Sequence, residues 1–230
     1  MTIKHSVVSR AEWTEARKTL LAKEKELTRI RDEVSRARRE LPWVRVEKNY
    51  VFDGPKGEET LAQLFDGRSQ LVVYHFMFDP SWKDGCKSCS WWADNIERNA
   101  LHLAHRDVTL MAVSRAPLEK LTAYAKRFGW TFKWVSSGRS DFNFDYDVSF
   151  DPSRAPQTYN YRPKTSALTE LPGISVFYRD ESGAVFHTHS TYSRGLDMMN
   201  AGYHFLDLVP KGRDEAEVGN MGWLRRRDEY

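Results

Sequence analysis

Cysteine is scarce in this sequence, and its scarcity excludes several classes of protein. The 230 residues contain two cysteines, Cys86 and Cys89, so a scaffold built on several structural disulfides is excluded. No apolar run approaches the roughly 18 to 20 residues that a membrane-spanning helix needs. The first six residues lack the apolar core of a secretory signal. We therefore expect a cytoplasmic protein with no membrane partner, in which any disulfide is transient or catalytic.

An excess of charge of one sign is also missing. Lys and Arg number 35 and Asp and Glu 32, which leaves a formal net charge of +3. No basic block dominates, so nucleic-acid binding is not expected. The triplet Arg225–Arg227 is followed by two acids and is interpreted as part of a solvated tail. Hydrophobic residues make up 40% of the chain, which is enough for a sizeable core.

The first 42 residues are predicted to form a helical arm. Ser9 and Glu12 have the spacing of a capping box, and Lys, Arg and Glu dominate from there to the Leu41-Pro42 boundary. A narrow apolar seam recurs every seventh residue, at Trp13, Leu20, Leu27, Val34 and Leu41. Such a seam packs along a single line. The arm either lies on its own domain or pairs with a second copy in a homodimer.

The remainder predicts one α/β domain over 43–215, followed by a tail over 216–230. The run 71–78 is continuously apolar, as in a central strand covered on both faces. Other strands are expected at 43–52, 108–113 and 131–135, with a hairpin at 174–178 and 184–189. Helices are expected at 60–65, from 86, at 117–128 and at about 195–207. The stretch 136–169 is too long for an ordinary loop and is interpreted as an insert.

The spacing Cys86-Lys87-Ser88-Cys89 follows the central strand and opens a helix. A redox dithiol occupies this position in a thioredoxin-like fold. The start of a helix lowers the pKa of a cysteine through its free N–H groups and its positive dipole end. We therefore assign Cys86 as the nucleophile and Cys89 as the resolving thiol.

A second element of the site is Pro172, which directly precedes the predicted hairpin. Thioredoxin-like proteins place a cis proline there, opposite the dithiol, where it positions the substrate backbone. We expect this role for Pro172, although proline before glycine is also a common turn. Trp82, Lys87, Ser88 and Gly173 complete the expected substrate-binding surface.

Four stretches together resemble a bacterial thioredoxin-like family of unknown function. They are Tyr74–Phe78, Cys86–Asp94 (CKSCSWWAD), Pro172–Asp180 (PGISVFYRD) and the segment from Tyr203 to Glu215. The resemblance implies a thioredoxin-like mixed sheet flanked by helices, with a front extension similar to that of peroxiredoxins. It does not supply a reaction.

Two departures from better-known relatives bear on the chemistry. Thioredoxin has Gly-Pro between its cysteines and tryptophan before the first, whereas this chain has Lys87-Ser88 and Gly85. The reduction potential of thioredoxin can therefore not be assumed for this dithiol. Peroxiredoxins place a hydroxyl three residues before the peroxidatic cysteine, where this chain has Lys83. Peroxidase activity of that type is not expected.

The leading hypothesis is a thiol–disulfide oxidoreductase that needs no cofactor. Its partner would be a disulfide-bearing protein or a small thiol substrate. A metal-binding alternative joins Cys86 and Cys89 to His187 and His189, which lie two apart on a strand and would share a face, as ligands for zinc or copper. A third possibility is a non-catalytic oligomeric module.

Two further features have open interpretations. His75 lies between apolar neighbours in the central strand, as a core histidine does, but it is also close in sequence to the dithiol. The aromatic run 142–146 within the insert forms either a lid over the site or the packing of a long loop.

Overall fold

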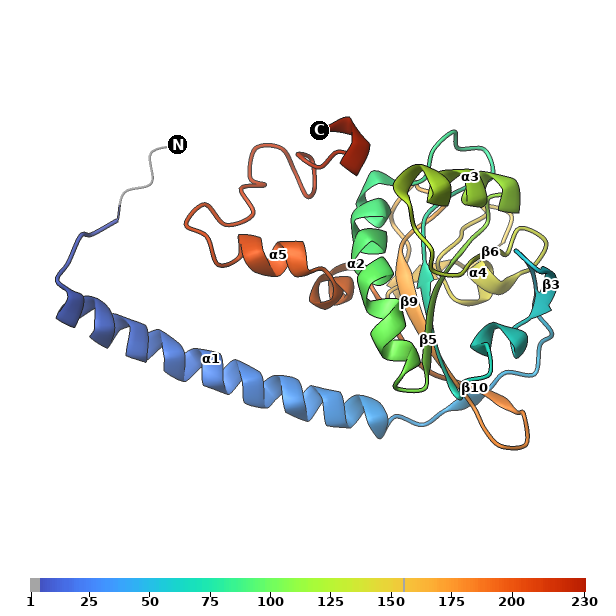
Figure 1. Cartoon of the computed structure of the whole chain (residues 1–230), viewed down its shortest axis with the longest axis horizontal. Helices are drawn as coiled ribbons and strands as arrows, with labels where there is room; N and C mark the ends of the chain where they lie inside the picture. Colours follow the sequence, from blue (N-terminus) through green and yellow to red (C-terminus); the bar gives the residue numbers. More distant parts are fainter. Residues whose placement is uncertain (1–4, 155) are drawn as a thin grey trace. The chain divides into compact units, whose positions relative to one another are not determined.

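The computed structural model describes residues 5–154 and 156–230, which fall into two compact units divided between Pro42 and Trp43 (Figure 1). The first unit contains α1 (Arg10–Arg39). Its predicted capping box is present: the Ser9 hydroxyl accepts from the Glu12 N–H, and the Glu12 carboxylate accepts from the Ser9 N–H. These bonds satisfy N–H groups that a helix start leaves without partners. Among the described residues, no helix has the length and apolar character to cross a membrane.

The second unit is built on a mixed sheet whose strands run in the order β1-β10-β9-β4-β5-β6-β2-β3. Two parallel crossovers pair β4 with β5 and β5 with β6, and β9 and β10 are added antiparallel. The strands are β1 (Val44–Arg45), β2 (Val51–Gly54), β3 (Gly57–Thr60), β4 (Gln70–His75), β5 (Val108–Ser114), β6 (Trp134–Ser136), β9 (Gly173–Arg179) and β10 (Val185–Tyr192). The order β5-β4-β9-β10 is that of a thioredoxin-like fold, which confirms the predicted fold class.

Helices connect and flank these strands. The first crossover is α2 (Lys87–Ala104), which lies across one face of the sheet in Figure 1, and the second is α3 (Leu118–Phe128). The shorter helices are η1 (Gln63–Phe65), α4 (Phe142–Asp145), η2 (Ser193–Met199), α5 (Ala201–Leu206) and η3 (Arg227–Glu229). A separate ribbon pairs β7 (Thr158–Tyr159) with β8 (Arg162–Pro163).

Two predicted elements differ from those observed. The expected strand 43–52 is split, because β1 pairs with β10 at one edge of the sheet whereas β2 joins β3 and β6 toward the other. The expected helix 195–207 breaks at Asn200, whose extended backbone ends η2 and whose side chain caps α5 by accepting from the Gly202 N–H. Two short elements therefore replace one helix.

The sheet separates two apolar layers, and β4 contributes to both. Tyr74 packs into the layer that contains Trp92 of α2 and Leu121 of α3. Val73 packs into the other layer, and His75 stacks on Tyr146 of that layer. Because successive side chains on a strand point to opposite faces, neighbouring residues of β4 lie on opposite sides of the sheet. The side on which a residue lies decides whether it can reach the dithiol.

Candidate redox site

Cys86 is held at the start of α2, just beyond the end of β4. It is the N-cap residue, with φ −57° and ψ 128°, and its carbonyl accepts from the Ser90 N–H at 3.0 Å. Its own N–H donates to the Met77 carbonyl at 3.1 Å, which joins the helix start to the segment after β4. The thiol therefore sits at the end of the helix where free N–H groups and the positive dipole favour an anion.

Cys89 lies one turn later and is turned into the core. It is only 2% exposed, and its Sγ accepts from the Met77 N–H at 3.5 Å. Its thiol also shares a hydrogen bond with the hydroxyl of Tyr74, which is 1% exposed. The two cysteines thus have unlike surroundings, since Cys86 is partly exposed and Cys89 is enclosed.

The surroundings shift the two thiol pKa values in opposite directions. The pKa of Cys86 is lowered to about 6, chiefly because the Cys89 thiol hydrogen-bonds to it, with further bonds from the Cys89 and Ser88 N–H groups and the Ser88 hydroxyl. Burial opposes this shift. The pKa of Cys89 is raised well above its ordinary range, first by burial and then by the neighbouring Cys86. At neutral pH, Cys86 is therefore the thiolate and Cys89 the thiol.

Gly85, the residue before Cys86, is held by two hydrogen bonds to its carbonyl. The Gly85 carbonyl accepts from the Tyr124 hydroxyl at 3.2 Å and from the Arg226 guanidinium at 3.0 Å. A Cβ at Gly85 would stand 2.8 Å from the Phe76 ring, so the backbone packs here as only glycine allows. These contacts hold the segment that presents Cys86.

The interpretation of Arg225–Arg227 as part of a solvated tail is wrong for Arg226, whereas Arg225 and Arg227 are exposed. Arg226 reaches the Gly85 carbonyl, and Arg227 pairs with Asp94 of α2 at 3.1 Å. Leu224, just before the triplet, is 4% exposed. A run of charges is usually solvated, but here a buried carbonyl and an acid on α2 provide partners that sequence spacing does not show.

Both sulfurs border a cavity of about 390 Å³. The wall of the cavity is largely apolar. Residues of β4, α2, the insert, η2 and the C-terminal segment form this wall. The lining residues are Tyr74, Met77, Cys86, Ser88, Cys89, Trp92, Tyr159, Leu168, Leu171, Pro172, Ser193, Arg194, Leu196, Asp197, Asn220 and Met221. Both cysteines therefore border one partly open hollow.

The structure brings Pro172 and Ser88 to this cavity with the cysteines. The Pro172 carbonyl accepts from the Tyr159 hydroxyl at 2.7 Å, which ties the insert to the segment before β9. Gly173 is buried instead, where a Cβ would meet Tyr192 and Val148 at 2.9 Å. Its predicted contribution to the substrate surface is not seen in the cavity wall.

Trp82 and Lys87 lie near the dithiol without lining the cavity. Trp82 packs on the edge of the core layer that contains Cys89, and its carbonyl accepts from the Lys120 ammonium at 3.0 Å. Lys87 is the first residue of α2 and is partly exposed. Contact of either side chain with a substrate stays a prediction.

Sequence reasoning missed two tyrosines of the site. Tyr74 follows from strand alternation, since it shares a face of β4 with Val72 and lies under α2. Tyr159 carries no such signal, because it belongs to an insert whose path is set by contacts distant in sequence. Its hydroxyl donates to Pro172 and accepts from the Ser193 N–H at 3.0 Å.

The metal alternative that joined Cys86 and Cys89 to His187 and His189 is wrong. A β-bulge separates the two histidines, so His187 pairs with Phe177 and His189 with Val176, and the shared face expected from alternation is lost. His187 packs in the layer across the sheet from Cys89, where its ring meets Tyr146. Within residues 5–154 and 156–230, no three His, Cys, Asp or Glu side chains group to hold a metal ion.

His75 also lies on the far side of the sheet from the dithiol. Its Nε2 is 2.9 Å from the Ser175 hydroxyl, which is 2.9 Å from that of Ser190, and the Ser190 hydroxyl is 2.8 Å from His187 Nε2. This buried polar chain accounts for His75 as a core histidine. It does not belong to the redox site.

The insert contributes to the site through residues other than those predicted. The aromatic run 142–146 contains α4, whose Phe142 is fully buried against Phe52 and Tyr50 in the far layer. This run is core packing and not a lid over the dithiol. The cavity wall instead receives Tyr159 and Leu168 from later in the insert.

A buried acid fixes the end of the insert against the sheet. Glu170 is 1% exposed, and its carboxylate accepts from the Ser149 hydroxyl at 2.7 Å and from Arg115 at 3.2 Å. Burial raises the pKa of Glu170 to about 7, although both partners oppose this shift. The next residue, Leu171, lines the cavity and donates its N–H to the Val148 carbonyl at 2.8 Å.

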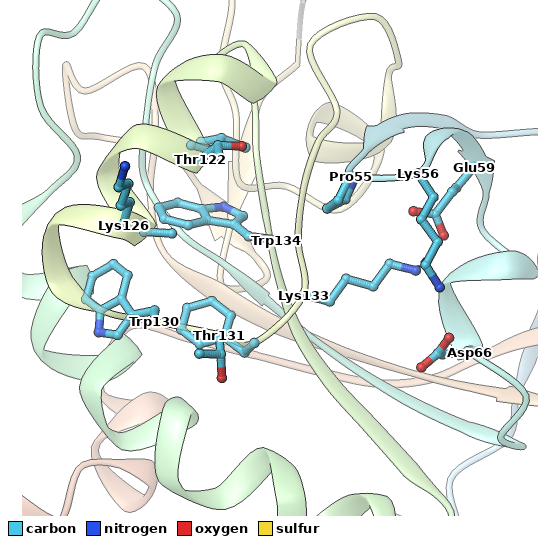
Figure 2. A pocket seen from close by; sticks show the side chains of 13 residues that line it. Pro55, Lys56, Glu59, Asp66, Thr122, Lys126, Trp130, Thr131, Lys133 and Trp134 are labelled. Atoms are coloured by element: carbon cyan, nitrogen blue, oxygen red, sulfur yellow. Dashed lines mark hydrogen bonds and ion pairs between the residues drawn. The ribbon is translucent and has the colours of Figure 1, made fainter.

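A larger cavity, of about 560 Å³, lies away from the cysteines between α3, β3 and β6 (Figure 2). Figure 2 shows Lys133 extended toward Glu59, with which it forms an ion pair, while Trp130 and Trp134 lie on the other side. Neither cysteine lines this cavity. The dithiol therefore borders the smaller cavity and not this one.

Comparison with solved structures finds distant likenesses. A peroxidoxin, BcpB from Mycobacterium tuberculosis, is 12% identical with a TM-score of 0.47, over 70% of this chain and 94% of that one. Peroxiredoxin Q from Xanthomonas campestris is 16% identical with a TM-score of 0.46, over 66% and 87%. A putative thiol:disulfide interchange protein DsbE from Chlorobium tepidum is 11% identical with a TM-score of 0.43, over 70% and 97%. These likenesses concern the fold alone.

No curated protein matches the chain. A family does match, over residues 2–230, and its description is "Bacterial protein of unknown function (DUF899)". The match spans both compact units, including α1 and the C-terminal segment that contacts Gly85. The chain therefore belongs to this bacterial family.

Proposed function

We propose that the protein is a thiol–disulfide oxidoreductase of the cytoplasm. The Cys86 thiolate attacks one sulfur of a substrate disulfide, forms a mixed disulfide and releases the first substrate thiolate. Cys89 then loses its proton and attacks the Cys86 sulfur. The products are a Cys86–Cys89 disulfide and the second substrate thiol, so the substrate disulfide gains two electrons and the protein dithiol loses them.

The observation that carries this proposal is the opposite ionisation of two adjacent thiols at one cavity. The pKa of Cys86 is lowered to about 6 at the helix start, whereas burial keeps Cys89 protonated. A thiolate is the attacking species in disulfide exchange, and a protonated partner does not compete with it. The Tyr74 hydroxyl donates to the Cys89 sulfur, a contact that favours the Cys89 thiolate once the mixed disulfide has formed.

The pH dependence of exchange tests the proposal. We expect the rate constant for oxidation of the reduced protein by bis(2-hydroxyethyl) disulfide to rise with pH and level off above about 6, because only the Cys86 thiolate reacts. An unperturbed cysteine would level off above about 8.5. Quenching at each pH, followed by alkylation and mass spectrometry, measures the disulfide formed.

Ser88→Ala provides the matched variant, because the Ser88 hydroxyl is one of the groups that lower the pKa of Cys86. Its profile should move to higher pH with the plateau rate retained. A wild-type profile that rises through pH 8 would contradict the lowered pKa. No oxidation of the dithiol at any pH would overturn the proposed function.

We also propose that α1 mediates a homodimer. Its apolar residues recur every seventh position from Trp13 through Val34, and a seam of that period packs best against a helix of similar length. The structure describes α1 as 30 residues long, and the longest other helix in the described residues, α2, has 18. A second α1 is therefore the partner that matches the seam.

Light scattering after size exclusion tests the dimer. The full chain should elute at twice the mass of one chain, and the double variant Leu20→Glu/Leu27→Glu should elute at one, because charges within the seam face each other across the pair. Lys18→Glu/Lys25→Glu, which changes exposed residues outside the seam, should remain dimeric. A wild-type mass of one chain would overturn the homodimer.

A further inference from the structure

The dithiol cavity is bordered by segments that lie outside the strand–helix core. Tyr159 and Leu168 come from the insert, Leu196 from η2 and Met221 from the C-terminal segment. They face Cys86 and Cys89 across the same space. A bare strand–helix junction would present the nucleophile on an open surface, where the disulfide of a folded protein could dock. Here the reacting sulfur borders a partly open hollow with a largely apolar wall.

These bordering segments are tied in place by hydrogen bonds. The Asn220 side chain accepts from the Tyr203 hydroxyl at 3.2 Å, and the Met221 N–H donates to the Glu215 carboxylate at 2.9 Å. On the insert side, Tyr159 bonds Pro172. These fixed segments leave a volume of about 390 Å³ beside the cysteines, which a small molecule can occupy without moving them.

The charged side chains of the cavity wall neutralise each other. Arg194 and Asp197 are the two charged residues that line it, and they form an ion pair at 3.2 Å. Arg213 contacts the same Asp197 at 2.9 Å and also pairs with Asp207. Apart from the Cys86 thiolate, the described residues of the wall therefore direct no uncompensated charge into the cavity. An anionic group placed there would lose water and meet the thiolate without gaining a partner.

From the volume, the apolar wall and the paired charges, we infer that the substrate is a small uncharged disulfide with apolar substituents. This inference rests on the proposed function and narrows it from any disulfide to one class. A volume of about 390 Å³ lies within the range of small-molecule sites. One apolar substituent of the disulfide occupies the cavity, and the sulfur bonded to that substituent lies against the Cys86 sulfur. Exchange releases two apolar thiols and leaves the Cys86–Cys89 disulfide.

Three disulfides test whether the substrate is small, uncharged and apolar: dibenzyl disulfide, oxidised glutathione and insulin. We expect dibenzyl disulfide to oxidise the dithiol with a rate that saturates as its concentration rises, because it binds before it reacts. Oxidised glutathione, which is charged, and insulin, which is a protein, should react more slowly and without saturation. Alkylation and mass spectrometry follow the protein dithiol in each case.

The double variant Leu168→Ser/Met221→Ser removes apolar wall without touching the cysteines. The variant should lower the rate of its oxidation by dibenzyl disulfide about ten-fold, because apolar surface against which the substrate would be buried is lost. Its reaction with bis(2-hydroxyethyl) disulfide should stay within about two-fold of wild type, since that probe buries little apolar surface. Leu101→Ser/Met198→Ser makes the same chemical change at exposed residues that do not line the cavity, and it should match wild type with both probes.

The outcomes separate the two proposals. Insulin or oxidised glutathione reacting as fast as dibenzyl disulfide, or an unchanged rate in Leu168→Ser/Met221→Ser, would overturn the substrate class and leave the oxidoreductase standing. A dithiol that none of the disulfides oxidises would overturn the oxidoreductase itself, and the substrate class with it.

Discussion

Cys86→Ser is expected to abolish disulfide exchange, with a loss of about 10³-fold or more in rate, because it removes the attacking atom. The serine hydroxyl at this position would not ionise near neutral pH as the Cys86 thiol does, whose pKa is lowered to about 6. Cys89 cannot take over the attack. It is 2% exposed, and its pKa is raised by burial.

Cys89→Ser is expected to stop the same reaction one step later. Cys86 can still attack, but no second thiol lies beside it to release the substrate. The mixed disulfide between Cys86 and the substrate should therefore accumulate, and intact-mass measurement would detect it as one substrate thiol added per chain. The serine hydroxyl can replace part of the hydrogen bond that Cys89 donates to Cys86.

Paired measurements on the two variants decide the order of attack. A covalent adduct on Cys86→Ser and none on Cys89→Ser would reverse the assignment of nucleophile and resolving thiol. Circular dichroism and thermal unfolding of both variants establish that the fold is retained. Equal activity of Cys86→Ser and wild type would remove the dithiol from the chemistry altogether.

The core of the site was predictable because it depends on local geometry. A buried strand followed by a helix that begins at Cys86 sets one thiol at the helix end and the next a turn later, under the helix. Cys86 stays partly exposed because it is the cap residue at the helix start, whereas Cys89 lies one turn further on and is buried between the helix and the sheet. For the same reason, Tyr74 could have been placed beside Cys89 from the alternation of its strand.

The rest of the site depends on contacts between segments far apart in sequence. The reach of Arg226 to Gly85 spans 141 residues, and the composition of the tail contains no sign of it. Tyr159 and Leu168 approach the cysteines only because Glu170 and Pro172 anchor the end of the insert.

The histidine pair failed as a prediction for a related reason. Alternation of side chains assumes an unbroken ladder, and the bulge between His187 and His189 breaks it. Sequence spacing of two residues therefore placed both rings on one face, whereas pairing with Phe177 and Val176 separates them.

Acidification is expected to destabilise the fold through His75. This side chain is 1% exposed, its Nδ1 has no hydrogen-bond partner, and burial lowers its pKa to about 3. In the unfolded chain the ordinary pKa of histidine is about 6.5. As pH falls below about 6.5 the unfolded state binds a proton that the native state does not, so stability is lost down to the native pKa. The slope is about 1.4 kcal/mol per pH unit for one such group.

Glu170 acts in the opposite direction over an overlapping range. Its pKa is raised to about 7 in the folded state by burial, so it contributes stability that is fully present below the ordinary carboxyl pKa and is lost as pH rises through about 7. Between those two values, acidification strengthens the fold through Glu170 and weakens it through His75. The wild-type curve alone therefore understates the effect of the histidine.

Comparison with His75→Gln isolates that effect, because glutamine retains a polar group that can reach Ser175 but does not titrate. Urea unfolding should show the free energy of wild type falling, between pH 6.5 and pH 5, by about 2 kcal/mol more than that of His75→Gln. His105→Gln, which changes an exposed histidine at the end of α2, should follow wild type across the same range. Parallel curves for wild type and His75→Gln would mean that His75 takes up its proton in the native state as readily as in the unfolded chain. The polar chain from His75 through Ser175 to Ser190 would then be open to water, contrary to the burial of all three side chains.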